Sequence, residues 1–329
     1  MVDEVNRRLN ATIEAALDPN PVIAPGKQGI SVMRRLILSI CAALSLAAPV
    51  AAQEAPARPL TVEVLRSGPG SLHANLALIQ GERDAVLVDA PFTVADAHRT
   101  VAMILESGKN LTHVFVTHDH PDHFFAMEVI QDAFPDVQVV AHPTVVADIW
   151  RSLPFKVARW GPMLGANGPR HPSAPRPIEG DTIELEGQAL LVIGPMQGDH
   201  VHATALWVPS IKALFPSDLV FNEVHLWLAE HDPEQVTEWA RSLDRLAALE
   251  PEIVVAGHAR PGLPNDASAL AFTRRYLAEW PVHVSRARDS AELRQLVQAS
   301  FPSTVDELDG FILGNSSKVA MGEEPKWEE

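Results

Sequence analysis

Three histidines and an aspartate lie within one short segment, at His118, His120, Asp122 and His123, in the pattern H-x-H-x-D-H. The segment directly follows the apolar run Val114–Val116, so it is predicted to be the loop at the end of a strand. Imidazole nitrogens and carboxylate oxygens suit zinc, and also iron or manganese. A solvated polar loop is the alternative interpretation. The sequence favours a metal site, because further donor residues follow downstream.

The downstream donors recur at four places, each at or near the end of a predicted strand. They are Asp199 and His200 in Gln-Gly-Asp-His, with His202 close behind, Asp218 in Pro-Ser-Asp, His225 in Asn-Glu-Val-His, and His258 in Ala-Gly-His. No G-x-S-x-G, P-loop or G-x-G-x-x-G pattern competes with them. The chemistry of this chain is therefore predicted to rest on metal ligands.

The elements that position these donors alternate between strands and helices. Strands are predicted at 61–65, 75–79, 85–89, 111–116, 137–141, 182–185, 189–193, 203–208, 212–215 and 253–256, and helices at 94–107, 125–134, 143–152, 233–249, 267–280 and 291–299. The helix at 233–249 is the clearest, with Asp232 as N-cap and Pro233 at its first position. Such alternation is typical of the α/β class.

Two segments lack this periodicity. Residues 151–177 hold six prolines, so we predict a long loop there. Its charged residues are all basic, at Arg151, Lys156, Arg159, Arg170 and Arg176. This bias suggests a loop that covers the metals and attracts an anionic substrate, and a solvated loop is the alternative. The tail 321–329 is predicted to fray.

Composition and the N-terminal region bound the class of protein. The net charge of −16 argues against nucleic-acid binding. Met33–Arg35 and the apolar run that follows predict a signal peptide at 33–52, and an uncleaved anchor is the alternative. We therefore expect a periplasmic or secreted protein with no stable membrane anchor after cleavage. Residues 1–32 would be a misassigned extension, and 53–59 a linker. The only cysteine, Cys41, lies inside the predicted signal, so His, Asp or Glu must hold any metal.

The donor pattern resembles that of metallo-β-lactamase-fold hydrolases. Their order is a strand-end Asp, H-x-H-x-D-H, a Gly-His turn, a strand-end Asp or Cys, and a final Gly-His. Here Asp89, the 118–123 segment, Asp218 and His258 match this order across about residues 60–260. The resemblance implies an α/β fold, a four-layer αββα sandwich over 60–320, with the site at one edge of the facing sheets.

The resemblance also implies a two-metal centre. The first metal would be bound by His118 and His120, the second by Asp122, His123 and His258, and Asp218 would bridge both. The chain departs from the pattern at the third ligand of the first metal, where Gly198-Asp199 stands in place of Gly-His. We favour His200 as this ligand, and Asp199 and His202 remain alternatives. A bridging aspartate resembles the glyoxalase II, lactonase and arylsulfatase-like branches better than the β-lactamases that use cysteine.

The implied activity is that of a secreted hydrolase with two zinc ions, or else with iron or manganese. A metal-bound hydroxide would cleave an ester, lactone, thioester or related bond in a small molecule, and Asp122 would orient this nucleophile as well as bind metal. His225 is a candidate substrate-binding residue, with a packed or surface imidazole as the alternative. The competing functions are a metallo-β-lactamase, a mononuclear iron dioxygenase of the same fold, and a metal-binding protein without activity.

Overall fold

The computed structural model describes residues 58–328. The predicted extension 1–32, the signal peptide 33–52 and all but the end of the linker 53–59 lie outside the described residues, so they stay predictions. Among the described residues, no helix combines the length and the apolar character needed to cross a membrane.

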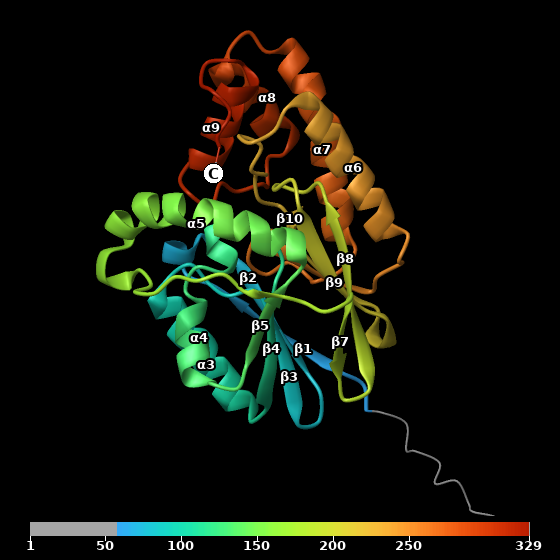
Figure 1. Cartoon of the computed structure of the whole chain (residues 1–329). Helices are drawn as coiled ribbons and strands as arrows, with labels where there is room; N and C mark the ends of the chain where they lie inside the picture. Colours follow the sequence, from blue (N-terminus) through green and yellow to red (C-terminus); the bar gives the residue numbers. More distant parts are fainter. Residues whose placement is uncertain (1–57, 329) are drawn as a thin grey trace, which may run out of the picture. The chain divides into compact units, whose positions relative to one another are not determined.

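Two β-sheets form the centre of the described chain (Figure 1). The first has the order β1 (Thr61–Arg66), β2 (Asn75–Gln80), β3 (Asp84–Val88), β4 (Asn110–Val116), β5 (Gln138–Ala141) and β6 (Arg176–Pro177). The second has the order β11 (Ile253–Ala259), β10 (Ala213–Asn222), β9 (Ala203–Val208), β8 (Gln188–Met196) and β7 (Thr182–Leu185). Strands β3 to β6 run parallel, as do β10 and β11, and the other pairs are antiparallel.

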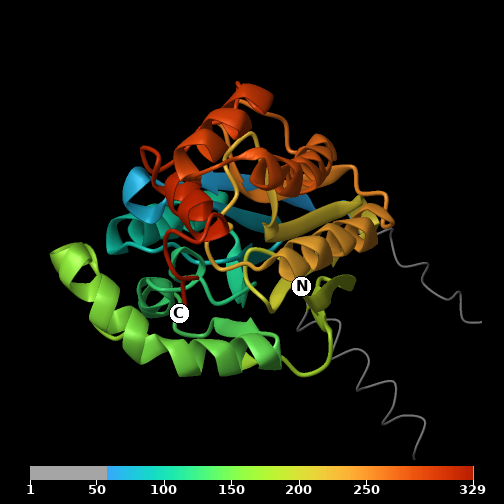
Figure 2. The ribbon, with the colours of Figure 1, turned by 90° about the horizontal axis from the view of Figure 1, so that it is seen from above.

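Helices cover the outer face of each sheet (Figures 1 and 2). The first sheet carries α3 (Val94–Ser107), α4 (Met127–Ala133) and α5 (Pro143–Leu164), and the second carries α6 (Pro233–Ala247), α7 (Ser268–Arg286), α8 (Ser290–Ser300) and α9 (Phe311–Ala320). Short 3-10 turns lie at Pro69–Ser71, Pro121–His123, Gly165–Asn167 and Pro209–Ile211. The predicted four-layer αββα sandwich is therefore confirmed.

The apolar core follows from these layers. Between the sheets, Val86 and Phe115 of the first sheet pack in one cluster with Leu190, Leu206 and Phe215 of the second. One further cluster lies between the first sheet and its helices, and another lies between the second sheet and its helices. A sheet with apolar side chains on both faces is stable only when both faces are covered. The strands are thus fixed firmly enough for their ends to hold side chains in place.

Helix α6 begins as the sequence predicts. Asp232 caps it by accepting a hydrogen bond from the Gln235 backbone at 2.8 Å, and the Gln235 side chain accepts one in return from the Asp232 backbone at 3.0 Å. Pro233 fits the first position because its missing N–H has no partner there in any helix. The face with Val236, Trp239 and Leu243 is buried against the second sheet, as expected.

Helix α5 differs from the expectation, because the structure continues it for 22 residues, from Pro143 to Leu164. The sequence suggested that it would end near residue 152, since interior prolines each cost a helix about 3 kcal/mol. Here Pro154 and Pro162 lie inside the helix. The buried face with Ile149, Leu153 and Lys156 continues past Pro154, and burial of this face outweighs the local preference. Of the predicted loop, only residues 168–175 remain without a helix or strand, between the 3-10 turn Gly165–Asn167 and β6.

Candidate metal centre

The H-x-H-x-D-H segment lies where the carboxyl end of β4 meets that of β3. Parallel neighbours end at the same edge of a sheet, so Asp89, directly after β3, reaches the segment after β4. Asp89 accepts hydrogen bonds from the Thr117 backbone N–H at 2.9 Å and from the Thr117 hydroxyl. Its own backbone adopts the left-handed region, at φ 65°. The aspartate at this strand end therefore anchors the loop that carries the donors.

Asp218 and His258 come from the second sheet, on neighbouring parallel strands. Strand β10 carries Asp218, β11 carries His258, and the register pairs Ser217 with Ala256. Gly257 lies against the Asp218 carboxylate so closely that a Cβ on it would overlap Oδ1. A glycine is thus required at this point for the two donors to come together.

The first group of donors consists of His118, His120, Asp199 and Asp218, whose ligand atoms all lie within 4.8 Å of one another. His120 Nδ1 lies 2.9 Å from Asp199 Oδ2, and His118 Nε2 lies 3.8 Å from Asp199 Oδ1. All four side chains are buried. The structure therefore brings two imidazoles and two carboxylates to one point, from the loop after β4, the loop between β8 and β9, and strand β10.

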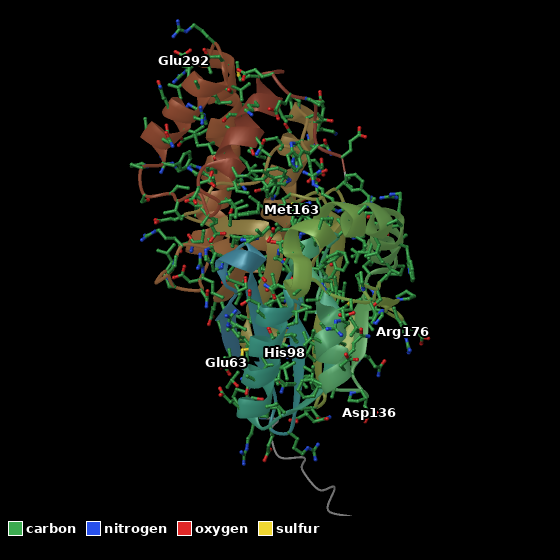
Figure 3. The ribbon with its side chains drawn as sticks, turned by 90° about the vertical axis from the view of Figure 1, so that its left-hand side faces the viewer. Glu63, His98, Asp136, Met163, Arg176 and Glu292 are labelled. Atoms are coloured by element: carbon green, nitrogen blue, oxygen red, sulfur yellow. The ribbon has the colours of Figure 1, made fainter. Side chains whose placement is uncertain are left out.

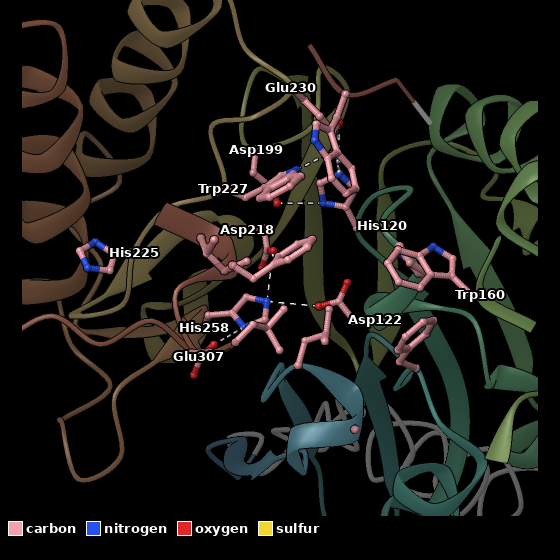
Figure 4. A pocket seen from close by; sticks show the side chains of 18 of the residues that line it. His120, Asp122, Trp160, Asp199, Asp218, His225, Trp227, Glu230, His258 and Glu307 are labelled. Atoms are coloured by element: carbon pink, nitrogen blue, oxygen red, sulfur yellow. Dashed lines mark hydrogen bonds and ion pairs between the residues drawn. The ribbon is translucent and has the colours of Figure 1, made fainter. Parts of the chain in front are cut away.

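The second group consists of Asp122, His123 and His258, also buried and within the same distance of one another. His258 Nε2 lies 3.3 Å from Asp122 Oδ2, and His123 Nε2 lies 3.6 Å from the same oxygen. Asp218 joins this group to the first, because its Oδ1 lies 3.3 Å from His123 Nε2 and its Oδ2 lies 3.3 Å from His258 Nε2. Figure 4 shows Asp218 and Asp122 converging on His258.

The donor atoms fit divalent metal ions. His118 Nε2, His123 Nε2, Asp199 Oδ1 and Asp218 Oδ1 are buried and have no hydrogen-bond partner. Buried polar atoms are nearly always paired, so unpaired ones that face each other indicate a missing ligand. Tetrahedral zinc with bonds of about 2.1 Å holds its ligand atoms about 3.4 Å apart. The 3.3–3.8 Å separations between these nitrogens and oxygens match that spacing.

Asp199, and not the favoured His200, lies in the first group. The Asp199 backbone N–H donates to the Asp218 carbonyl at 3.3 Å, which holds the two aspartates side by side. The His200 ring lies near His120, with centroids 5.6 Å apart, but its Nδ1 accepts a hydrogen bond from the His202 backbone at 3.2 Å. His202 itself binds Asp148 of α5 at 2.6 Å. The structure thus favours the carboxylate as the third donor of the first group.

Carboxylates behind the imidazoles fix three of the rings. His123 Nδ1 lies 2.9 Å from Asp89, and His258 Nδ1 lies 2.8 Å from Glu307. His120 Nε2 lies 3.4 Å from Glu230. A carboxylate on the far ring nitrogen orients a metal-binding imidazole and strengthens it as a ligand. Glu230 and Glu307 were not predicted, because neither belongs to a local motif and each meets its histidine only through the fold.

Electrostatics in the cluster also favour a bound cation. Burial lowers the pKa of His123, but Asp218, Asp122 and Asp89 outweigh burial and raise that pKa well above its usual value. Burial raises the pKa of Asp199 well above its usual value, although His120 acts in the opposite direction. Without a cation, protons on His123 and on Asp199 reduce the net negative charge of the buried cluster. A divalent metal would replace those protons, so metal binding should release them.

We expect Glu307→Gln to weaken metal binding by about 10- to 100-fold, the usual effect of losing such a carboxylate partner. The amide keeps the shape of the side chain but not the charge that holds His258 Nδ1–H. Metal affinity is measured by competition with a chelator. Glu223→Gln is the matched control, because Glu223 pairs with Arg260 at 2.5 Å and contacts none of the donors. An unchanged affinity in Glu307→Gln would contradict this role.

A cavity of about 420 Å³ opens above the two groups, and His120, Asp122, Asp199, Asp218 and His258 form part of its lining. Its other walls are mostly apolar side chains. None of the five basic residues predicted to recruit an anion lines it within the described chain. Lys156 instead is buried beside Asp119, and Arg151 pairs with Asp148. Recruitment of an anionic substrate by the segment 151–177 therefore stays a prediction.

His225 lines the same cavity but lies apart from the donor cluster, on the side opposite Trp160 (Figure 4). Its Nδ1 lies 3.0 Å from the Tyr276 hydroxyl. Burial lowers the pKa of His225 to about 4, so its ring is neutral at pH 7. Whether it contacts substrate stays a prediction.

Comparison with known proteins identifies a family and several similar structures. A family profile described as "Metallo-beta-lactamase superfamily" matches residues 69–258. A metallo-beta-lactamase family protein from Thermus thermophilus is 20% identical with a TM-score of 0.57, over 80% of this chain and 94% of that one. The DIM-1 metallo-beta-lactamase is 20% identical with a TM-score of 0.49, over 68% and 98%. A metallo-beta-lactamase from Pontibacter korlensis is 21% identical with a TM-score of 0.46, over 62% and 87%. A search of curated proteins found no match.

Proposed function

This chain belongs to the metallo-beta-lactamase superfamily, whose members are mostly metal-dependent hydrolases, and on that premise we propose that it is a binuclear zinc hydrolase. The bond it cleaves would be an ester, lactone or thioester in a small molecule. The observation that carries this proposal is the pair of buried donor groups joined by Asp218 at the floor of the cavity.

The residues of the chain have distinct roles in this proposal. His118, His120 and Asp199 would hold one zinc ion, Asp122, His123 and His258 the other, and Asp218 both. When bound, the metals lower the pKa of a water molecule and polarise the bond to be broken. Asp122 contacts the two histidines through Oδ2. Its Oδ1 would accept a proton from the attacking water and hand it to the leaving group.

A second function is favoured by one observation, the donor set of the first group. Besides the shared Asp218, this group holds His118, His120 and Asp199, and two imidazoles with one carboxylate are the donors that mononuclear iron oxygenases use. A dioxygenase of the same fold is therefore the competing proposal. It differs from the hydrolase in metal identity, metal number and need for oxygen, so one measurement separates the two.

The test is elemental analysis of the full chain together with activity on lactones, esters and thioesters. We expect about two zinc ions per chain, with metal and hydrolysis both lost in His120→Ala. His98→Ala is the matched control, because His98 is exposed on α3 (Figure 3) and belongs to neither donor group. One iron per chain with oxygen uptake would establish the dioxygenase instead. A chain that binds no metal would overturn both proposals.

A further inference from the structure

The cavity above the donors has a polar floor and an apolar wall that comes from distant parts of the chain. Phe92 and Trp160 line it from the first half, and Trp227, Phe311 and Trp327 from the second. Its volume lies in the range of small-molecule sites, which are mostly apolar with a few convergent polar groups. An apolar wall therefore faces the same cavity as the donor groups.

Trp227, Phe311 and Trp327 pack together, and we refer to these three as the aromatic wall. The rings of Trp227 and Phe311 are stacked, with centroids 5.9 Å apart and planes at 2°. Trp327 stands edge-on to both, at 5.1 Å from Trp227 and 5.7 Å from Phe311. Edge-on and stacked pairs of this kind hold each ring in a fixed orientation. The wall is thus a preformed surface.

The C-terminal segment, which the sequence predicted to fray, supplies Trp327 to this wall. The Trp327 backbone N–H donates to the Ala229 carbonyl at 2.9 Å, and the Arg159 guanidinium carbon lies 4.2 Å from the centroid of the Trp327 ring. Figures 1 and 2 both show the C-terminus beside α5. The indole is therefore held between the loop before α6 and helix α5, which is a defined position for a residue so near the chain end.

The aromatic wall can contact a ligand through its rings but has few free hydrogen-bonding groups. The Trp227 indole N–H already donates to Glu230 at 2.7 Å, and Glu230 in turn contacts His120. Arg159 lies over the rings of Trp327 and Trp160 and does not line the cavity. A charged group placed against this surface would lose its hydration without a partner. An uncharged apolar group would gain from burial there.

We propose that the aromatic wall binds an apolar acyl or aryl group of the substrate, and that Trp327 of the C-terminal segment sets the size of group that is accepted. The inference rests on the proposed function only for the bond that is cleaved. The substrate class is then an ester, lactone or thioester with an uncharged apolar substituent, held with its carbonyl over the donors.

The test uses straight-chain alcohols from butanol to decanol as unreactive probes of the wall. Their dissociation constants are measured by calorimetry on the full chain, so no hydrolysis is required. We expect each added methylene to tighten binding by up to about fourfold, the effect of burying one such group, until the chain fills the cavity. Equal affinities across the series would overturn the inference.

Variants assign the effect to Trp327. We expect Trp327→Ala to weaken binding of the tightest alcohol by at least about tenfold, because truncation of a central aromatic side chain has an effect of this size. Trp327→Phe should recover part of the loss. Trp150→Ala is the matched control, because Trp150 lies on α5, is 62% exposed and does not line the cavity. Equal losses in Trp327→Ala and Trp150→Ala would contradict a specific role.

The outcomes separate this inference from the proposed function. One outcome is that alcohols bind with the expected dependence on chain length while no ester, lactone or thioester is hydrolysed. That result would support binding of apolar groups by the aromatic wall and contradict the hydrolase proposal. If short and long substrates are hydrolysed with equal kcat/KM and alcohols do not bind, the hydrolase stands and the wall is overturned. Retention of selectivity for chain length in Trp327→Ala would also overturn the role of the C-terminal segment.

Discussion

Replacing Gly257 by alanine is expected to lower metal affinity and hydrolysis by more than about 100-fold, the upper end of the loss seen when a partner of a metal ligand is removed. A Cβ at this position would overlap Asp218 Oδ1 and lie 2.7 Å from the Ser217 carbonyl carbon. Both neighbours are held in place, since Asp218 is buried and Ser217 donates a hydrogen bond to Asp89 at 2.8 Å. The Asp218 carboxylate must therefore move away from both donor groups.

The measurements are metal content, kcat/KM and the far-ultraviolet circular dichroism of Gly257→Ala. The last shows whether the variant is folded, so that loss of the site is not confused with loss of the fold. Gly161→Ala is the control, because a Cβ on Gly161 of α5 meets nothing within 4 Å and should leave activity intact. Full metal content and activity in folded Gly257→Ala would show that Asp218 is not a shared ligand.

Lys156→Met is expected to lower the free energy of unfolding by about 3–5 kcal/mol, as when one partner of a buried ion pair is removed. Lys156 Nζ lies 2.9 Å from Asp119 Oδ1 and also donates to the Asp119 carbonyl. Both side chains are buried. Burial already raises the pKa of Asp119, although Lys156 opposes that rise, so the variant would leave a carboxyl group that must be protonated.

Stability of Lys156→Met is measured by chemical denaturation, with metal content measured in parallel. Because Asp119 lies between His118 and His120 in the sequence, we also expect weaker metal binding. The double variant Lys156→Met/Asp119→Asn should recover part of the stability, since it removes the carboxyl group that has lost its partner. Lys212→Met is the control, because Lys212 pairs with Glu252 on the surface. Loss of an exposed ion pair should change the free energy of unfolding little. Equal stability losses in the two lysine variants would contradict the role of the buried pair.

Much of the fold followed from local patterns. Helix α6 was predicted from its capping residues and apolar face, and α3 (Val94–Ser107) from its periodicity, because both signals lie within one element. Helix α5 was predicted too short. Its continuation past Pro154 depends on burial of Leu153 and Lys156 against the rest of the chain, and no local rule reports that burial.

The sequence by itself determined the spacing of His118, His120, Asp122 and His123, and the family to which the chain belongs. The chain itself fixes that spacing, because the four residues lie within six consecutive positions. A short loop after a buried strand can adopt only a few conformations, so its donor side chains stay close together. The order of the remaining donors along the chain also matches the family, so Asp218 and His258 could be named in advance. The structure brings both of them to the same cluster.

Only the tertiary structure favours Asp199 over His200 as the third donor of the first group. Adjacent residues in a turn point in different directions, and the direction here is set by the backbone hydrogen bond from Asp199 to Asp218, a neighbour in space and not in sequence. The same reason applies to Glu230 and Glu307 behind the imidazoles and to Trp327 in the cavity wall. Each of these residues contacts a residue that is distant in the sequence. Sequence spacing alone does not predict which distant residues the fold brings together.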